Sequence, residues 1–94
     1  MSKDNAIFIG EKPFMNYVTA VVMQFTTKNA EEVLIKARGK FISRAVDVAE
    51  IATKRFLDET VRVKEVKINS EEFKNKEDKD VRVSIIEIIL EKAQ

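Results

Sequence analysis

A single glycine joins two apolar patterns of different period, and this junction constrains the fold more than any other stretch. Residues 32–38 alternate, so that Val33, Ile35 and Ala37 share one face of an extended strand. Residues 41–57 instead carry apolar side chains at helical spacing. Gly39 lies between the two patterns and permits a tight turn. The sequence therefore predicts a strand that turns directly into a long helix.

The chain before this junction follows the same alternation of strand and helix. Residues 6–9 are a short apolar run that ends at Gly10, which predicts a buried strand. Pro13 then suits the first position of a helix. Apolar residues recur at helical spacing after it, so residues 13–27 are predicted to form an amphipathic helix.

The chain after the junction reads as two strands joined by a polar hairpin arm. Alternation over residues 61–68 changes phase near Lys64 and Glu65, which predicts a β-bulge. Residues 70–80 are polar and charged and form the hairpin arm. Residues 81–90 give the last strand, whose second half is apolar on both faces and is therefore expected to be covered on both.

The element order β-α-β-α-β-β predicts a two-layer α+β sandwich, with one four-stranded sheet and two helices on one face. Ninety-four residues suit a single domain, residues 1–94, and residues 1–5 are expected to be a flexible N-terminus.

Composition excludes several classes of function. The chain contains no cysteine and no histidine, so it offers no disulfide, no thiolate metal site and no imidazole base. Ser43 has no histidine to activate it, and one glycine between a strand and a helix does not make a phosphate-binding loop. We expect neither catalysis nor a cofactor or metal. The apolar runs are shorter than a membrane span, and no signal-peptide pattern opens the chain, so a soluble intracellular protein is expected.

Positive charge is concentrated around the glycine junction. The chain has 17 basic and 16 acidic residues. Residues 33–46 contain no acid but four cations, namely Lys36, Arg38, Lys40 and Arg44. Such a patch on a nearly neutral chain predicts an anionic partner, with an ordinary solvated turn as the plainer alternative.

Two further positions have open alternatives. Tyr17 lies at the start of the first helix, where it is either a half-buried aromatic with its hydroxyl in water or a contact to base or phosphate. Phe56, near the end of the second helix, is either a core residue or an exposed association contact.

Four motifs resemble the Alba family of archaeal chromatin and nucleic-acid-binding proteins. They run in the family's order and the likeness extends from Ala6 to about Lys92. The motifs are residues 10–18 (GEKPFMNYV), 36–40 (KARGK), 42–47 (ISRAVD) and 84–88 (SIIEI).

The resemblance implies a homodimer that coats and compacts double-stranded DNA without strong sequence preference and that also binds RNA. It implies a cytoplasmic, chromosome-associated protein. Lys12 would contact the nucleic-acid backbone and be a candidate for acetylation, with a deacetylase as a further partner. Phe56 would join dimer to dimer. The remaining residues implicated in nucleic-acid binding are Tyr17, Lys36, Arg38, Lys40 and Arg44.

The chain departs from the family pattern in two places. Glu11 stands where the family often has a second lysine or a neutral residue. Residues 71–80 hold three lysines and five acids, a net charge of −2, whereas family arms tend to be basic. We therefore expect the patch, rather than the hairpin arm, to supply the main contacts. An RNA-binding module of a ribonucleoprotein, and a purely structural dimer that holds other proteins, are the alternative functions.

Overall fold

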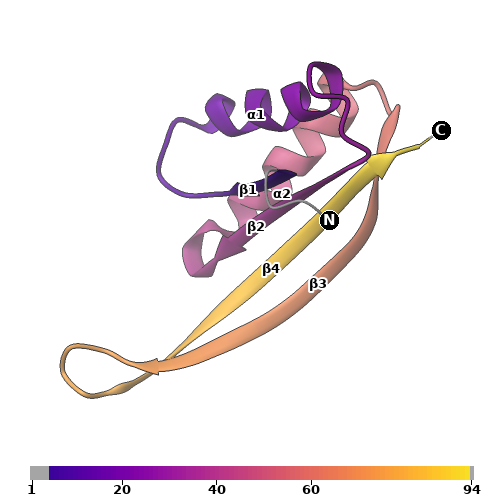
Figure 1. Cartoon of the computed structure of the whole chain (residues 1–94). Coiled ribbons are helices and arrows are strands. Elements are labelled where there is room, and N and C mark those ends of the chain that lie inside the picture. Colours follow the sequence, from indigo (N-terminus) through magenta and orange to yellow (C-terminus); the bar gives the residue numbers. More distant parts are fainter. Residues whose placement is uncertain (1–4, 94) are drawn as a thin grey trace.

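Two helices cover one face of a four-stranded sheet in the computed structural model of the chain, which describes residues 5–93 (Figure 1). The expected flexible N-terminus, residues 1–5, lies outside the described residues except for Asn5. The elements in chain order are β1 (Ala6–Phe8), α1 (Phe14–Thr26), β2 (Glu32–Arg38), a 3₁₀ turn (Gly39–Phe41), α2 (Ile42–Ile51), a π-helical turn (Ala52–Phe56), β3 (Val61–Lys74) and β4 (Asp80–Lys92).

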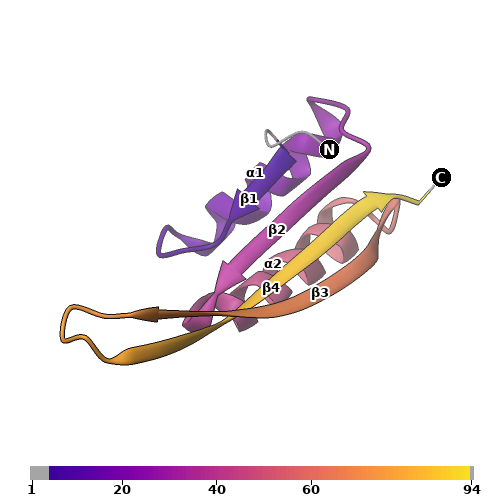
Figure 2. The same ribbon diagram turned by 60° about the horizontal axis from the view of Figure 1, so that its bottom comes forward.

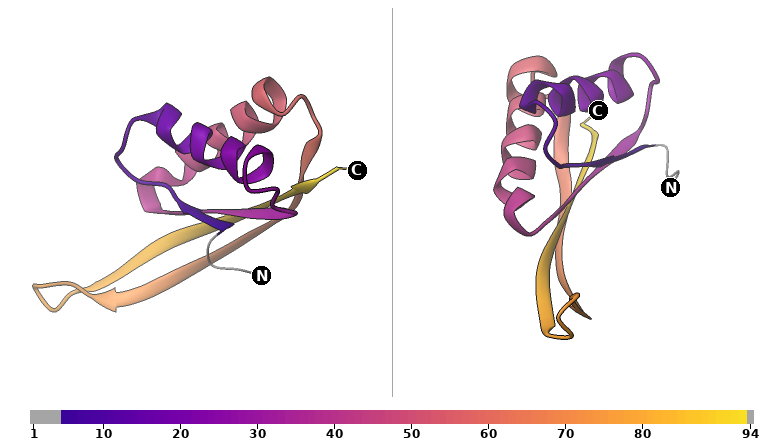
Figure 3. Two further views of the ribbon diagram at one scale, coloured as in Figure 1. Left: turned by 45° about the horizontal axis from the view of Figure 1, so that its top comes forward. Right: turned by 90° about the vertical axis from the view of Figure 1, so that its left-hand side faces the viewer.

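The sheet has the strand order β1-β2-β4-β3, which confirms the predicted architecture. β1 runs parallel to β2, and the other two pairings are antiparallel. Both helices lie on the same side, as the view in Figure 3 shows, and Figure 2 looks onto the opposite side. We call this opposite side the open face of the sheet.

The strand-turn-helix junction forms as predicted. Gly39 has a φ of +56°, a conformation that costs a side-chain-bearing residue energy and glycine almost none. The predicted helix over 41–57 is less regular than expected, because it opens with a 3₁₀ turn and closes with a π turn. At the π turn the hydroxyl of Thr53 donates to the carbonyl oxygen of Ala49 at 2.8 Å, the acceptor that its own amide would use in an α-helix.

The core lies between the helices and the sheet. Val33, Ile35 and Ala37 of β2 are buried there, on the face that their alternation predicted. The helices supply side chains that are almost completely removed from water, namely Val18 and Val21 of α1 and Ala45 and Val48 of α2. No helix within residues 5–93 is long and apolar enough to cross a membrane.

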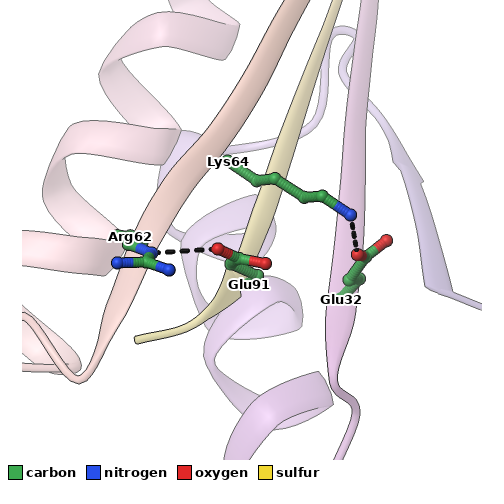
Figure 4. A network of polar contacts seen from close by, with 4 residues as sticks. All are labelled: Glu32, Arg62, Lys64 and Glu91. Carbon is green, nitrogen blue, oxygen red and sulfur yellow. Dashed lines mark hydrogen bonds and ion pairs between the residues drawn. The ribbon is translucent and has the colours of Figure 1, made fainter. Parts of the chain in front are cut away.

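The predicted β-bulge is present between Val63 and Glu65, where the register of β3 against β4 shifts. Beside it the Nε of Arg62 lies 2.9 Å from a carboxylate oxygen of Glu91, and the Nζ of Lys64 lies 2.5 Å from one of Glu32 (Figure 4). The hydrogen bond and the charge of Glu32 raise the pKa of Lys64 above its ordinary value. Two cations of β3 beside the bulge therefore meet carboxylates of β4 and β2.

The hairpin arm is a regular β-ribbon, whereas the sequence predicted strands that stop at residue 68 and resume at residue 81. β3 and β4 stay paired out to Lys74 and Asp80. Asn75 closes the turn, because its side-chain oxygen accepts from the amides of Glu77 and Lys79 at 2.9 and 3.0 Å. The ribbon projects beyond the helices (Figures 1 and 3), so the molecule measures 48 Å along its longest axis.

Exposed apolar side chains gather on β3 rather than on the last strand. Ile85 and Ile89, on the open face of β4, are already buried within the single chain, so that face is not an exposed apolar surface. Val63, Val66 and Ile68 of β3 are exposed, and Ile68 retains 82% of its accessible surface. The apolar surface that remains exposed to water is therefore at the β3 edge of the sheet.

Candidate nucleic-acid interface

Tyr17 fixes the loop that carries Lys12. The side chain is buried, with 8% of its surface exposed, and its hydroxyl oxygen accepts from the amides of Gly10 and Lys12, each at 3.0 Å. A Cβ atom at Gly10 would lie 3.4 Å from this hydroxyl, so the approach is close. Both interpretations of Tyr17 from the sequence placed its hydroxyl at the surface, in water or against a ligand. In the structure the hydroxyl instead lies inside the loop. Its position makes Tyr17 an anchor for the backbone of residues 10–12.

Arg44 ties the same loop to α2. Its Nη1 donates to the carbonyl oxygen of Gly10 at 2.5 Å, and its guanidinium carbon lies 5.7 Å from the centroid of the Tyr17 ring. The side chain is half-buried, and within residues 5–93 it forms no ion pair. The guanidinium therefore keeps its charge uncompensated while its position is fixed by a hydrogen bond and an aromatic face.

Lys12 and Lys40 are the lysines nearest in sequence to the two parts that this anchor joins. Lys12 is exposed and has no ion-pair partner among the described residues. The Nζ of Lys40 lies 3.9 Å from a carboxylate oxygen of Glu11 and 5.4 Å from the centroid of the Phe41 ring. Both members of the Glu11 pair are highly exposed, so their attraction is weak. We call Lys12, Lys40 and Arg44 the loop cluster.

The other two predicted cations point elsewhere. Lys36 and Arg38 alternate with buried residues of β2 and so lie on the open face. The Nζ of Lys36 is 3.4 Å from Glu87, its direct neighbour on β4, and the guanidinium of Arg38 is 3.0 Å from Glu71 of β3. The basic stretch is therefore divided between the loop cluster and the open face.

Folding brings acidic residues from other elements next to the cations of residues 33–46. Three of these four cations meet a carboxylate from another element, namely Glu87, Glu71 and Glu11. These pairs are exposed or half-exposed, so each contributes little to stability and a phosphate can replace the carboxylate. The sequence did hold a signal for the first pair, because Lys36 and Glu87 each alternate with apolar residues in strands that pair.

Phe56 and Phe8 complete the candidate set. Phe56 has 53% of its surface exposed at the end of the π turn, which excludes the core alternative. It lies at the opposite end of the helical segment from Arg44.

Phe8 has 66% of its surface exposed and was missed by sequence reasoning, because its short apolar run suggested a fully buried strand. Within residues 5–93 no group of acidic side chains is arranged to hold a metal ion.

Known proteins match this chain over most of its length. The family model described as Alba matches residues 5–70. The DNA/RNA-binding protein Alba of Methanococcus maripaludis is 52% identical over 87 residues, 93% of this chain and 97% of the relative. The DNA/RNA-binding protein Alba 1 of Archaeoglobus fulgidus is 56% identical over 89 residues, 95% of this chain and 97% of the relative. The structure of Alba from Thermoplasma volcanium superposes with a TM-score of 0.85 at 46% identity, covering 94% of this chain and 100% of that one.

Proposed function

This chain belongs to the Alba family, and from that premise we propose that it binds nucleic acid without strong sequence preference, coating double-stranded DNA as a homodimer and also binding RNA. The relatives' names are those of binding proteins rather than enzymes, in line with the chemistry expected from the sequence. A chromosome-associated location in the cytoplasm follows from the same proposal.

The observation that carries this proposal is the fixed position of the loop cluster. The guanidinium of Arg44 and the backbone that carries Lys12 are both held at the Tyr17 anchor, so they are in place before a ligand arrives. Preorganised side chains lose less conformational entropy on binding than mobile ones. Cations on a rigid loop and a helix suit phosphate oxygens, and phosphate contacts carry no sequence information by themselves.

The proposed dimer surface is the trough between α2 and β3. One end of the trough is lined by Ile42, Ile68 and Ile86, and the other by Val63 together with polar and charged side chains, among them Thr53 and Glu50. Val63, Val66 and Ile68 of β3 are exposed, and exposed apolar side chains that gather in one place mark an interaction site.

The edge of β3 itself favours face packing over strand pairing. β3 is 14 residues long, and within the described residues it pairs only with β4. Its bulge and its exposed cations, including Arg62, Lys64 and Lys67, are features that discourage edge-to-edge pairing. A second copy that packs against the trough would cover the apolar side chains and leave the charged edge in water. Two-fold symmetry would then present two loop clusters to one nucleic acid.

Two further roles extend the proposal. Phe56, exposed and away from the loop cluster, would make the contact between neighbouring dimers on a coated duplex. Lys12 would be the residue that is acetylated, and a deacetylase would reverse the modification. Acetylation removes its charge and a hydrogen-bond donor, which weakens phosphate binding.

The direct test compares affinities for two duplex DNAs of unrelated sequence, one duplex RNA and one single strand, at a single salt concentration. We expect the two DNAs to bind equally within about threefold and the RNA to bind as well. Strong discrimination between the two DNAs would require base readout and contradict the proposal. A large preference for RNA would favour the ribonucleoprotein alternative. Absence of salt-sensitive binding to every ligand would favour the structural dimer.

A further inference from the structure

An exposed aromatic ring lies on the open face, beside the cations that the loop cluster does not contain. Phe8 ends β1 and is in register with Lys36 of β2, so the two side chains share a face of the sheet. A groove of about 380 Å³ opens here, lined among others by Phe8, Phe41, Lys36, Arg38 and Glu71. The ring of Phe8 keeps 66% of its surface in water. Figure 2 shows this side of the sheet, with β1 at its edge.

The surroundings of the ring favour one kind of ligand. Single-stranded nucleic acids bind to aromatic rings on which bases stack, next to cations that follow the phosphates. Lys36 and Arg38 lie on the same face as Phe8, two residues apart on β2. Lys40 follows on the far side of Gly39, with its ammonium group over the Phe41 ring. The groove is thus bordered by cations that lead from the open face to the loop cluster.

The carboxylates near the groove do not block such a ligand. Glu71 and Glu87 hold Arg38 and Lys36 through pairs whose side chains are between 30% and 53% exposed. Exchanging an exposed carboxylate for a phosphate leaves each cation with an anionic partner. Duplex DNA cannot use the ring in the same way, because its bases are already stacked and their faces are covered.

We propose that Phe8 is a stacking platform for an unpaired base of single-stranded nucleic acid, whose neighbouring phosphates are bound by Lys36 and Arg38. The inference rests on the proposed function, since it assigns a second ligand class to the same chain. It separates two modes of binding on one protomer. The loop cluster and the open-face cations bind phosphates of any nucleic acid, and the ring of Phe8 adds affinity for single strands only.

The first test measures affinities of the unmodified protein, Phe8→Ala and Phe8→Tyr for a 12-nucleotide oligo(dT) and for a duplex DNA. Phe8→Ala should bind oligo(dT) about tenfold more weakly, within the range of a single lost stacking contact. Phe8→Tyr should retain the affinity, and duplex binding should change by less than about twofold. Met23→Ala, which removes a half-exposed apolar side chain from α1, is the matched control and should change neither affinity.

A second test reports the stacking contact itself. The chain contains no tryptophan, so Phe8→Trp introduces a single indole fluorophore. Oligo(dT) should quench its fluorescence, whereas the indole of Met23→Trp should stay unquenched. This measurement keeps the proposal testable even where Phe8→Ala folds poorly.

The outcomes separate this inference from the proposed function. Unchanged oligo(dT) affinity in Phe8→Ala, equal quenching at both tryptophans, or an equal loss of duplex affinity would each overturn the stacking platform. Dissociation of the oligomer in Phe8→Ala would assign the ring to contact with a second copy and also overturn it. If the unmodified protein binds neither ligand, the proposed function itself fails.

Discussion

Replacing Glu71 by Gln is expected to tighten nucleic-acid binding and, at the same time, to weaken the folded protein slightly. The carboxylate of Glu71 lies 3.0 Å from the guanidinium of Arg38, and both side chains are 53% exposed. An exposed pair of this kind contributes about 0.2–1 kcal/mol to folding. Glu71→Gln should therefore lower the free energy of unfolding by an amount in that range for each protomer.

The gain in binding follows from the same pair. A phosphate that contacts Arg38 must displace Glu71 in the unmodified protein but not in the variant. With two protomers on one duplex the difference is about 0.4–2 kcal/mol, from twice the value for one exposed pair. This corresponds to roughly 2- to 30-fold tighter binding, since 1.4 kcal/mol is a factor of about ten. Fluorescence anisotropy with a labelled duplex at one low salt concentration, and urea unfolding, measure the two effects.

Glu72→Gln is the matched control. Glu72 is the next residue of β3, carries the same charge and lies on the opposite face of the ribbon, and within residues 5–93 it forms no ion pair. A general loss of negative charge would raise the affinity of both variants equally. Equal gains, or no gain in Glu71→Gln, would refute the argument that Glu71 competes with phosphate for Arg38.

Three further experiments test other parts of the account. Lys12→Gln, which mimics acetylation, should lower affinity modestly and reduce the salt slope by about 2, that is about 1 for each protomer. An unchanged slope would remove Lys12 from the interface. Ile68→Lys should sediment as a monomer, whereas Phe56→Ala should remain dimeric but coat DNA less cooperatively. If Ile68→Lys is still a dimer, the α2–β3 trough is not the dimer surface. The triple variant of the hairpin arm replaces Lys74, Lys76 and Lys79 by alanine. Arg38→Glu should lower the binding affinity more than this triple variant at the same salt concentration. The reverse order would make the arm the principal contact.

Local patterns predicted most of the fold. The turn at Gly39 and the bulge near Lys64 both follow from changes of period or phase within a few residues, and both are confirmed. The length of the ribbon did not follow from such a pattern. Residues 70–80 are mostly exposed on both faces, so pairing there is carried by the backbone and leaves no apolar alternation to detect.

The candidate site was less predictable because its geometry depends on residues distant in the sequence. The alternation of β2 did place Lys36 and Arg38 on one face, away from the buried residues. The acids that meet them, Glu87 and Glu71, come from strands more than 30 positions away, so the charge balance required the strand register. The role of Tyr17 as an anchor likewise depends on two backbone amides, which carry no sequence signal.

The salt dependence of duplex DNA binding tests the central claim most directly. If a dimer engages about 4–8 phosphates through its loop clusters and open-face cations, the logarithm of the binding constant should fall with the logarithm of salt concentration at a slope of roughly −4 to −7. The slope should be the same for duplexes of unrelated sequence, because phosphate contacts do not depend on the bases. A slope near zero would contradict the claim that this protein binds nucleic acid through its phosphates.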